Sequence, residues 1–69
     1  MSIRKGSTVT WRWGTSSVSG TVAEVHRDKV TRQTKGESVT RNGSRADPAY
    51  VIEQDDGTVV LKLRSEVGR

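Results

Sequence analysis

Two groups of side chains in this 69-residue chain have the chemistry to bind a partner. The first group is basic, and its guanidinium and ammonium groups can contact phosphate oxygens. Residues 1–45 hold nine basic and three acidic residues, a net charge of +6, whereas residues 46–69 hold three and five, a net charge of −2. This asymmetry favours a polyanionic partner, and the alternative is a well-charged, solvated surface. The candidates for nucleic-acid contacts are Arg12, Lys29, Arg32, Lys35 and Arg41.

The second group is aromatic and consists of two tryptophans and one tyrosine, with no phenylalanine. Trp11 and Trp13 are two positions apart on an expected strand, so they face the same side. Together with Tyr50 they are the candidates for an aromatic groove that anchors a protein or peptide. The alternative is that these rings fill the core of a domain that has few other large side chains.

The residue pattern does not predict catalysis. An enzyme needs a base beside a nucleophile, a pair of carboxylates or a metal cage. His26 is the single histidine, and it lies among charged neighbours. Asp55 and Asp56 fit a tight turn, because a calcium loop needs further oxygen ligands at set spacing. The seven glycines fall singly at turns and form no phosphate-binding loop. We therefore expect no enzymatic activity, no metal site and no cofactor.

Length and composition predict one small domain over residues 1–69. The hydrophobic fraction is only 30%, but it is concentrated in alternating segments, which favours a packed domain over disorder. The chain has no cysteine, which fits a reducing compartment, and no apolar run of the roughly 20 residues that span a membrane. We expect a cytoplasmic protein without membrane association, and the sequence leaves its oligomeric state open.

Alternating apolar residues predict strands over residues 7–13 and 18–27. In the second of these strands the apolar parity changes between Gly20 and Ala23. A bend or bulge explains such a change, and the prediction places it at Gly20. The last residues, 64–69, favour a single 3₁₀ or helical turn.

Two hairpins are expected in the remainder of the chain. Residues 30–41 have little apolar content and favour a protruding hairpin that turns at Lys35-Gly36, with Thr31 facing Thr40. The Asp56-Gly57 pair favours a two-residue type I′ turn, which places Leu61 opposite Ile52. The second hairpin would then bury one face only. Several short strands with closely spaced turns predict a small all-β barrel.

Three stretches together resemble a known family. They are residues 5–14 (KGSTVTWRWG), 39–44 (VTRNGS) and 47–57 (DPAYVIEQDDG) with the following Val60–Lys62. They are similar to the hypervirulence-associated protein TUDOR domain family, whose members are small bacterial and fungal proteins of unknown function. The resemblance covers nearly the whole chain and implies an SH3-like, Tudor-type barrel of about five strands, with the hairpin near residues 30–41 as an elaboration.

The resemblance implies no established activity. Tudor domains in general can bind methylated lysine or arginine in an aromatic cage. Here such a cage has only Trp11, Trp13 and Tyr50 to draw on, fewer aromatic residues than these cages typically use. Two hypotheses for a non-enzymatic interaction module follow. One is nucleic-acid binding through the basic face, and the other is protein or peptide binding through the aromatic groove.

Overall fold

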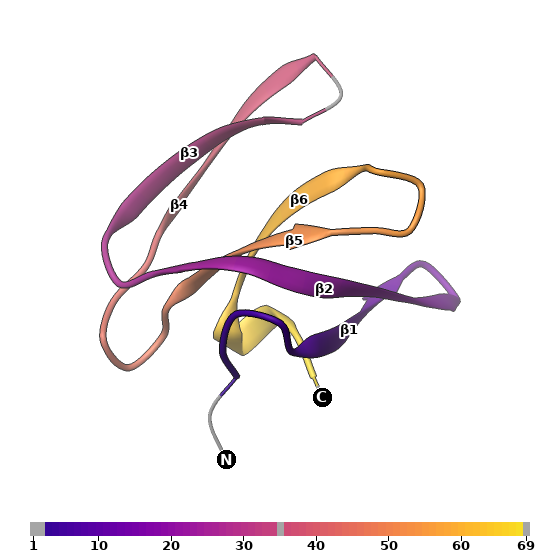
Figure 1. Ribbon diagram of the computed structural model, residues 1–69, viewed down its shortest axis with the longest axis horizontal. Coiled ribbons are helices and arrows are strands. Elements are labelled where there is room, and N and C mark those ends of the chain that lie inside the picture. Colours follow the sequence, from indigo (N-terminus) through magenta and orange to yellow (C-terminus); the bar gives the residue numbers. More distant parts are fainter. Residues whose placement is uncertain (1–2, 35, 69) are drawn as a thin grey trace.

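The computed structural model describes residues 3–34 and 36–68, and their fold is all-β (Figure 1). The elements in chain order are β1 (Thr8–Trp13), β2 (Ser16–His26), β3 (Lys29–Thr34), β4 (Glu37–Asn42), β5 (Ala49–Glu53), β6 (Val59–Leu63) and the 3₁₀ turn η1 (Arg64–Glu66). Strands β1-β2-β5-β6 form a curled antiparallel sheet in that order, and β3-β4 form a second sheet. The predicted small SH3-like/Tudor-like barrel with a protruding hairpin is confirmed.

Strands β1 and β2 form because their apolar residues alternate with hydroxyl and charged ones. Val9 and Trp11 are buried, and Thr10 between them is exposed. The expected irregularity in β2 lies between Val22 and Glu24, so its prediction at Gly20 is wrong. The bulge changes which residues of β2 point into the first core, so that Val22 before it and Val25 after it both pack there although they are three positions apart.

Gly20 instead permits close packing between the strands. A Cβ atom at this position would lie 2.5 Å from Ile52 Cγ2 and 2.9 Å from the carbonyl oxygen of Glu53. Both distances are shorter than side chains normally allow, so the position has room for hydrogen alone. The absent side chain lets β5 lie tightly against β2, beside the ring of Trp11.

The β5–β6 hairpin has a longer loop than predicted. Gln54 N–H donates to the Thr58 carbonyl at 2.8 Å, and Gly57 N–H donates to the Gln54 carbonyl at 2.9 Å, so three residues lie between the paired ends. Gly57 has a φ of 86°, the left-handed conformation that closes such a loop. The register shifts by one residue, Ile52 pairs with Val60, and the predicted two-residue turn is wrong.

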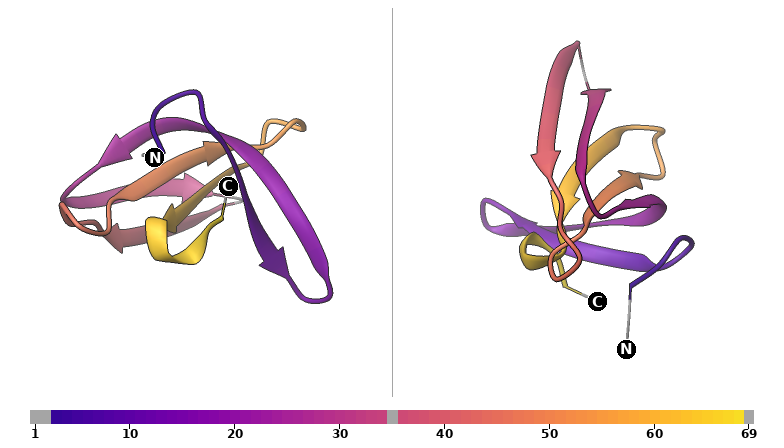
Figure 2. Two further views of the ribbon diagram at one scale, coloured as in Figure 1. Left: turned by 90° about the horizontal axis from the view of Figure 1, so that it is seen from below. Right: turned by 90° about the vertical axis from the view of Figure 1, so that its left-hand side faces the viewer.

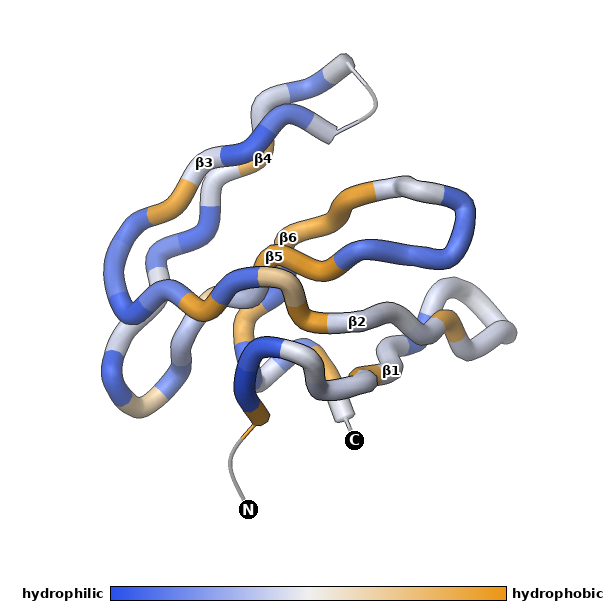
Figure 3. The backbone as a smooth tube through the Cα atoms, in the orientation of Figure 1, coloured by the Kyte–Doolittle hydropathy of each residue, from blue (hydrophilic) through white to orange (hydrophobic). Residues whose placement is uncertain are grey.

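This register leaves β5 buried on both faces, where the sequence predicted a hairpin buried on one. The first core contains Val9, Trp11, Val22, Tyr50 and Ile52, and the second contains Val30, Ala49, Val51 and Leu61. Successive residues of β5 therefore enter opposite cores, as in a strand covered on both sides. In Figure 3 the hydrophobic stretches follow β5 and β6, and the loop that joins them is hydrophilic.

The β3–β4 hairpin provides the cover for the second core. Its predicted pairing is confirmed, since Thr31 pairs with Thr40 and their hydroxyls hydrogen-bond at 2.8 Å. Val30 and Val39 pack against the second core, while the far end of the hairpin stands away from the curled sheet (Figures 1 and 2). The predicted turn includes position 35, which lies outside the described residues.

The C-terminal segment closes the barrel on the side of β1. The predicted turn near the C-terminus is confirmed as η1, and after it Gly68 exchanges two hydrogen bonds with Thr10, of 2.8 and 2.7 Å. Asp47 holds the turn by accepting bonds of 2.8 Å each from the backbone N–H and the hydroxyl of Ser65. Strand β1 thus pairs with β2 on one side and, at Thr10, with Gly68 on the other, whereas among the described residues β6 pairs with β5 alone. None of the described helical residues forms a segment long and apolar enough to cross a membrane.

Candidate functional site

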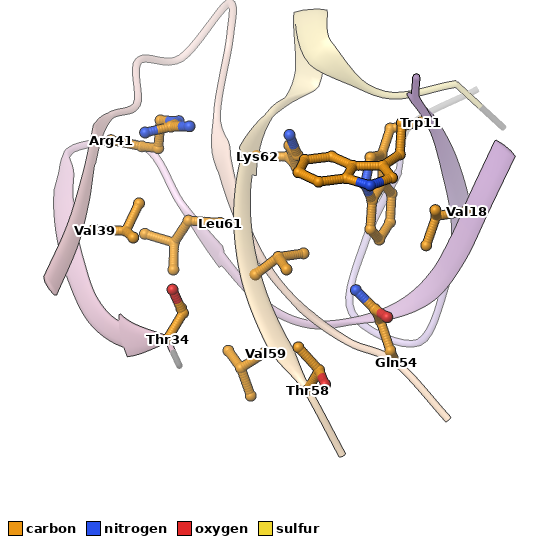
Figure 4. A pocket seen from close by; sticks show the side chains of 12 residues that line it. Trp11, Val18, Thr34, Val39, Arg41, Gln54, Thr58, Val59, Leu61 and Lys62 are labelled. Atoms are coloured by element: carbon orange, nitrogen blue, oxygen red, sulfur yellow. The ribbon is translucent and has the colours of Figure 1, made fainter. Parts of the chain in front are cut away.

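A groove of 370 Å³ opens along the outer edge of β6 (Figure 4). One wall comes from the β1–β2 hairpin and contains Trp11, Trp13 and Val18. The opposite wall comes from the β3–β4 hairpin and contains Thr34, Val39 and Arg41. The floor is β6 itself. The groove therefore exists because β3–β4 covers the second core without pairing with β6.

The side chains of β6 alternate between the two walls, as strand geometry requires. Val59 and Leu61 belong to the second core and lie on the side of Val39. Val60 packs on the first core, and Lys62, two positions along, lies on the same side beside Trp11 (Figure 4). A ligand in the groove would meet the backbone edge of β6 between the wall that holds the two tryptophans and a mixed wall, in which Val39 lies between Thr34 and Arg41.

The three predicted aromatic residues occupy different environments. Trp13 is 72% exposed and lines the groove, and Trp11 is 7% exposed, with its ring forming part of both the groove wall and the first core. Tyr50 is 1% exposed and does not line the groove. Burial raises the pKa of the Tyr50 phenol above its ordinary value. The structure thus brings the two tryptophans together at the groove, and it buries Tyr50 in the first core beside Trp11, where it cannot contribute to the groove.

The predicted basic residues do not share one surface. Arg32 and Arg41 lie on the inner face of the β3–β4 hairpin, and each is paired with a carboxylate, Arg32 Nη2 with Glu24 at 2.6 Å and Arg41 Nε with Glu66 at 3.3 Å. Among the described members of the set, only Arg41 lines the groove.

The other predicted basic residues lie elsewhere. Arg12 is exposed on the face of β1 opposite the tryptophans, and Lys29 is exposed at the start of β3. Lys35 lies outside the described residues. The four described residues of this set therefore do not line one surface, because only Arg32 and Arg41 share a face, and the charges of these two are offset by carboxylates.

Glu24 connects β2 to the hairpin. Its carboxylate accepts hydrogen bonds from His26 Nε2 at 2.7 Å and from Arg32 Nη2 at 2.6 Å. The bond from His26 is the largest cause of a lowered pKa at Glu24, and Arg32 adds to it. This cluster fixes the side chain of Arg32 and gives His26 a structural partner. Among the described residues no group of histidines, cysteines or carboxylates is arranged to hold a metal ion.

Sequence reasoning missed Lys62 as a groove residue. The predicted two-residue turn placed it on the face opposite the aromatic side chains, and the longer loop moves it to the face shared with Tyr50, its partner on β5. It lines the groove, and the described part of the chain offers it no ion pair within 4.0 Å. If a three-residue loop had been assumed, the alternation of side chains along β6 would have placed Lys62 on the face shared with Tyr50.

Comparison with known proteins gives one result. Residues 6–67 match the family model described as "Hypervirulence associated proteins TUDOR domain", so the match covers nearly the whole chain. No curated protein and no solved structure matches the chain.

Proposed function

The chain belongs to the hypervirulence-associated protein TUDOR domain family, and on this premise we propose that it is a non-enzymatic module that binds a protein partner in the groove along β6. Tudor-like domains are generally non-catalytic interaction modules, and the expected cytoplasmic location is part of the proposal. The observation that carries it is the exposure of Trp13, 72% of whose surface is open to solvent beside an apolar floor.

An exposed tryptophan is the side chain most suited to anchoring a protein partner. Its ring offers a large rigid surface that costs little conformational entropy to bury, and tryptophan is enriched among the residues that dominate binding energy. Trp11 lies beside it as a wall fixed by the first core. The groove therefore combines one accessible ring with one that is already ordered, and this arrangement reduces the cost of binding.

The geometry supports this hypothesis better than nucleic-acid binding. A phosphate backbone needs several free cations aligned along one surface. Here Arg32 and Arg41 are paired with carboxylates, and Arg12 and Lys29 lie on separate elements. The excess of positive charge is then a general property of the surface that favours encounters with acidic partners.

A displayed library of random peptides, selected against the purified domain, tests the proposal. Peptides that bind the wild-type domain are titrated against Trp13→Ala, and the loss of an anchor residue should weaken binding by at least about tenfold. Arg12→Ala is the matched control, since it removes an exposed side chain at the neighbouring position on the opposite face of β1. Its affinity for the same peptides should stay within about twofold.

Short single- and double-stranded oligonucleotides, titrated at two salt concentrations, provide the competing outcome. Binding that falls steeply with salt and depends on Arg12 but not on Trp13 would replace the peptide hypothesis with the nucleic-acid one. A library from which no peptide dependent on Trp13 can be selected would also overturn the proposal.

A further inference from the structure

Building on the proposed function, we infer that the partner binds as an extended segment that adds an antiparallel strand to the outer edge of β6, with apolar residues against both walls and an acidic residue at Lys62. The inference concerns the backbone of the groove floor, and the proposed function alone does not require it.

The hydrogen-bonding pattern of the β5–β6 hairpin shows which groups of β6 face outward. The loop closes with a bond from Gln54 N–H to the Thr58 carbonyl, so Thr58 faces β5. Because facing alternates along an antiparallel strand, Val60 and Lys62 also bond to β5, and the backbone groups of Val59 and Leu61 point away from it. No backbone bond from another described segment reaches these two residues.

Leu63 is the next residue of β6 whose backbone N–H should point away from β5, and the unpaired edge of β6 ends there. Leu63 N–H points away from β5 and donates to Glu66 Oε1 at 2.8 Å, and the same carboxylate oxygen accepts a bond from Arg41 Nε at 3.3 Å. At the other end the 54–58 loop turns the chain back. The open stretch is therefore short, with two N–H donors and two carbonyl acceptors at Val59 and Leu61.

The walls determine the side chains of the added strand. Residues opposite Val59 and Leu61 point toward Val39, where an apolar side chain fits. The residue opposite Val60 points toward the wall formed by the two tryptophans, which also favours an apolar side chain.

The remaining position is opposite Lys62. This ammonium group has no ion pair among the described residues, and none of their carboxylates lines the groove, so a glutamate there adds charge complementarity. Because the added strand runs antiparallel to β6, its first residue lies opposite Lys62 and its last opposite Val59. The favoured segment is therefore Glu-Val-Leu-Val. A protein partner with such an exposed segment fits the groove, and a second copy of this chain is the competing occupant.

The probe is the capped peptide Glu-Val-Leu-Val, titrated into the isotopically labelled domain at millimolar concentrations. Strand addition should shift the amide resonances of Val59 and Leu61 in the NMR spectrum and slow their hydrogen exchange. The peptide Lys-Val-Leu-Val should bind more weakly, since it places two ammonium groups together. Lys62→Met should remove the preference between the two peptides.

N-methylated forms of the peptide separate backbone pairing from side-chain docking. Methylation of both valine nitrogens blocks the donors that face β6 and should weaken binding by at least about tenfold, the effect of losing two ordinary hydrogen bonds. Methylation of the leucine nitrogen is the matched control, because that N–H faces solvent and binding should persist. In the protein, Val59→Pro removes one outward donor, and Val59→Ala controls for the shortened side chain.

Each outcome decides the inference. Binding that depends on Trp13 but leaves the Val59 and Leu61 amides unprotected would overturn strand addition and leave the proposed function intact. Equal loss on methylation of leucine and of the valines would also overturn it, as would failure of Glu-Val-Leu-Val to bind. A concentration-dependent dimer that protects the same two amides without peptide would assign the edge to a second copy of the chain.

Discussion

The substitution Gly20→Ala tests whether the spacing between β2 and β5 is as tight as the structure indicates. The added methyl group would lie 2.5 Å from Ile52 Cγ2 and 2.9 Å from the carbonyl oxygen of Glu53. Ile52 is fully buried in the first core and cannot move outward, and the carbonyl belongs to the backbone of β5. Neither neighbour can yield without displacing the strand, so the substitution should destabilise the fold.

Overpacking of this kind typically costs about 1–3 kcal/mol, and we expect about 2 kcal/mol because one contact is with backbone. For a domain of this size that change should lower the melting temperature by about 8–16 °C. It is a large share of the roughly 3–10 kcal/mol that holds a 69-residue domain together. Urea unfolding followed by circular dichroism measures the change in the free energy of unfolding, and thermal unfolding provides the second value.

Gly68→Ala is the matched control. A Cβ atom at Gly68 would lie 3.8 Å from Thr10 Oγ1, an ordinary contact, and the two backbone bonds to Thr10 would remain. Its free energy of unfolding should change by less than about 0.5 kcal/mol. If Gly20→Ala were as mild as Gly68→Ala, β2 and β5 would be farther apart than described, and the packing that orders Trp11 would need revision.

Two further predictions follow from the titrating groups. Burial raises the pKa of Tyr50, so the phenolate absorbance of this single tyrosine should appear only above the ordinary pKa of tyrosine. The stabilising contribution of the neutral phenol should be lost as the pH rises through the raised pKa. Titration of the phenol at its ordinary pKa in the folded protein would contradict its burial. The pKa of Glu24 is lowered, so its contribution is present above the ordinary pKa of glutamate and is lost as the pH falls through the lowered value. Glu24→Gln should therefore destabilise the domain by less than about 1 kcal/mol at neutral pH, with the difference shrinking in acid, and an undiminished difference in acid urea titrations would refute this assignment.

The sequence predicts the parts of the fold that depend on local patterns. The alternation around Val9 and Trp11 places β1, and the sparse apolar content of residues 30–41 places a protruding hairpin with the observed pairing. Prediction from the sequence fails at the loop between β5 and β6, because the same residues are compatible with two types of turn. Asp56-Gly57 fits a two-residue loop and a three-residue loop equally well, and the choice rests on long-range packing, which buries β5 on both faces.

The candidate site shows the same limit. That tryptophans two residues apart face one side is a local property, and both do line the groove. Their different burial depends on where β5 and β6 lie, since Trp11 packs in the first core and Trp13 extends past it. The position of Lys62 depends on the register of the hairpin, and the pairing of Arg32 with Glu24 depends on how the hairpin folds back over β2. These contacts are between segments that are distant in the sequence, and no local spacing of residues predicts them.

The pair of hydrogen bonds between Thr10 and Gly68 has a consequence for how the domain forms. It joins the first strand to Gly68, so all of the intervening residues must be present before the barrel closes. Contacts this distant in sequence carry a high entropic cost in the folding transition state, and all-β domains of this kind fold in about milliseconds to seconds. During synthesis on the ribosome, β1 would pair with β2 early but would wait for η1 to leave the exit tunnel. Until then its second edge would remain open to other nascent chains, and this interval is when the protein is most exposed to misassembly.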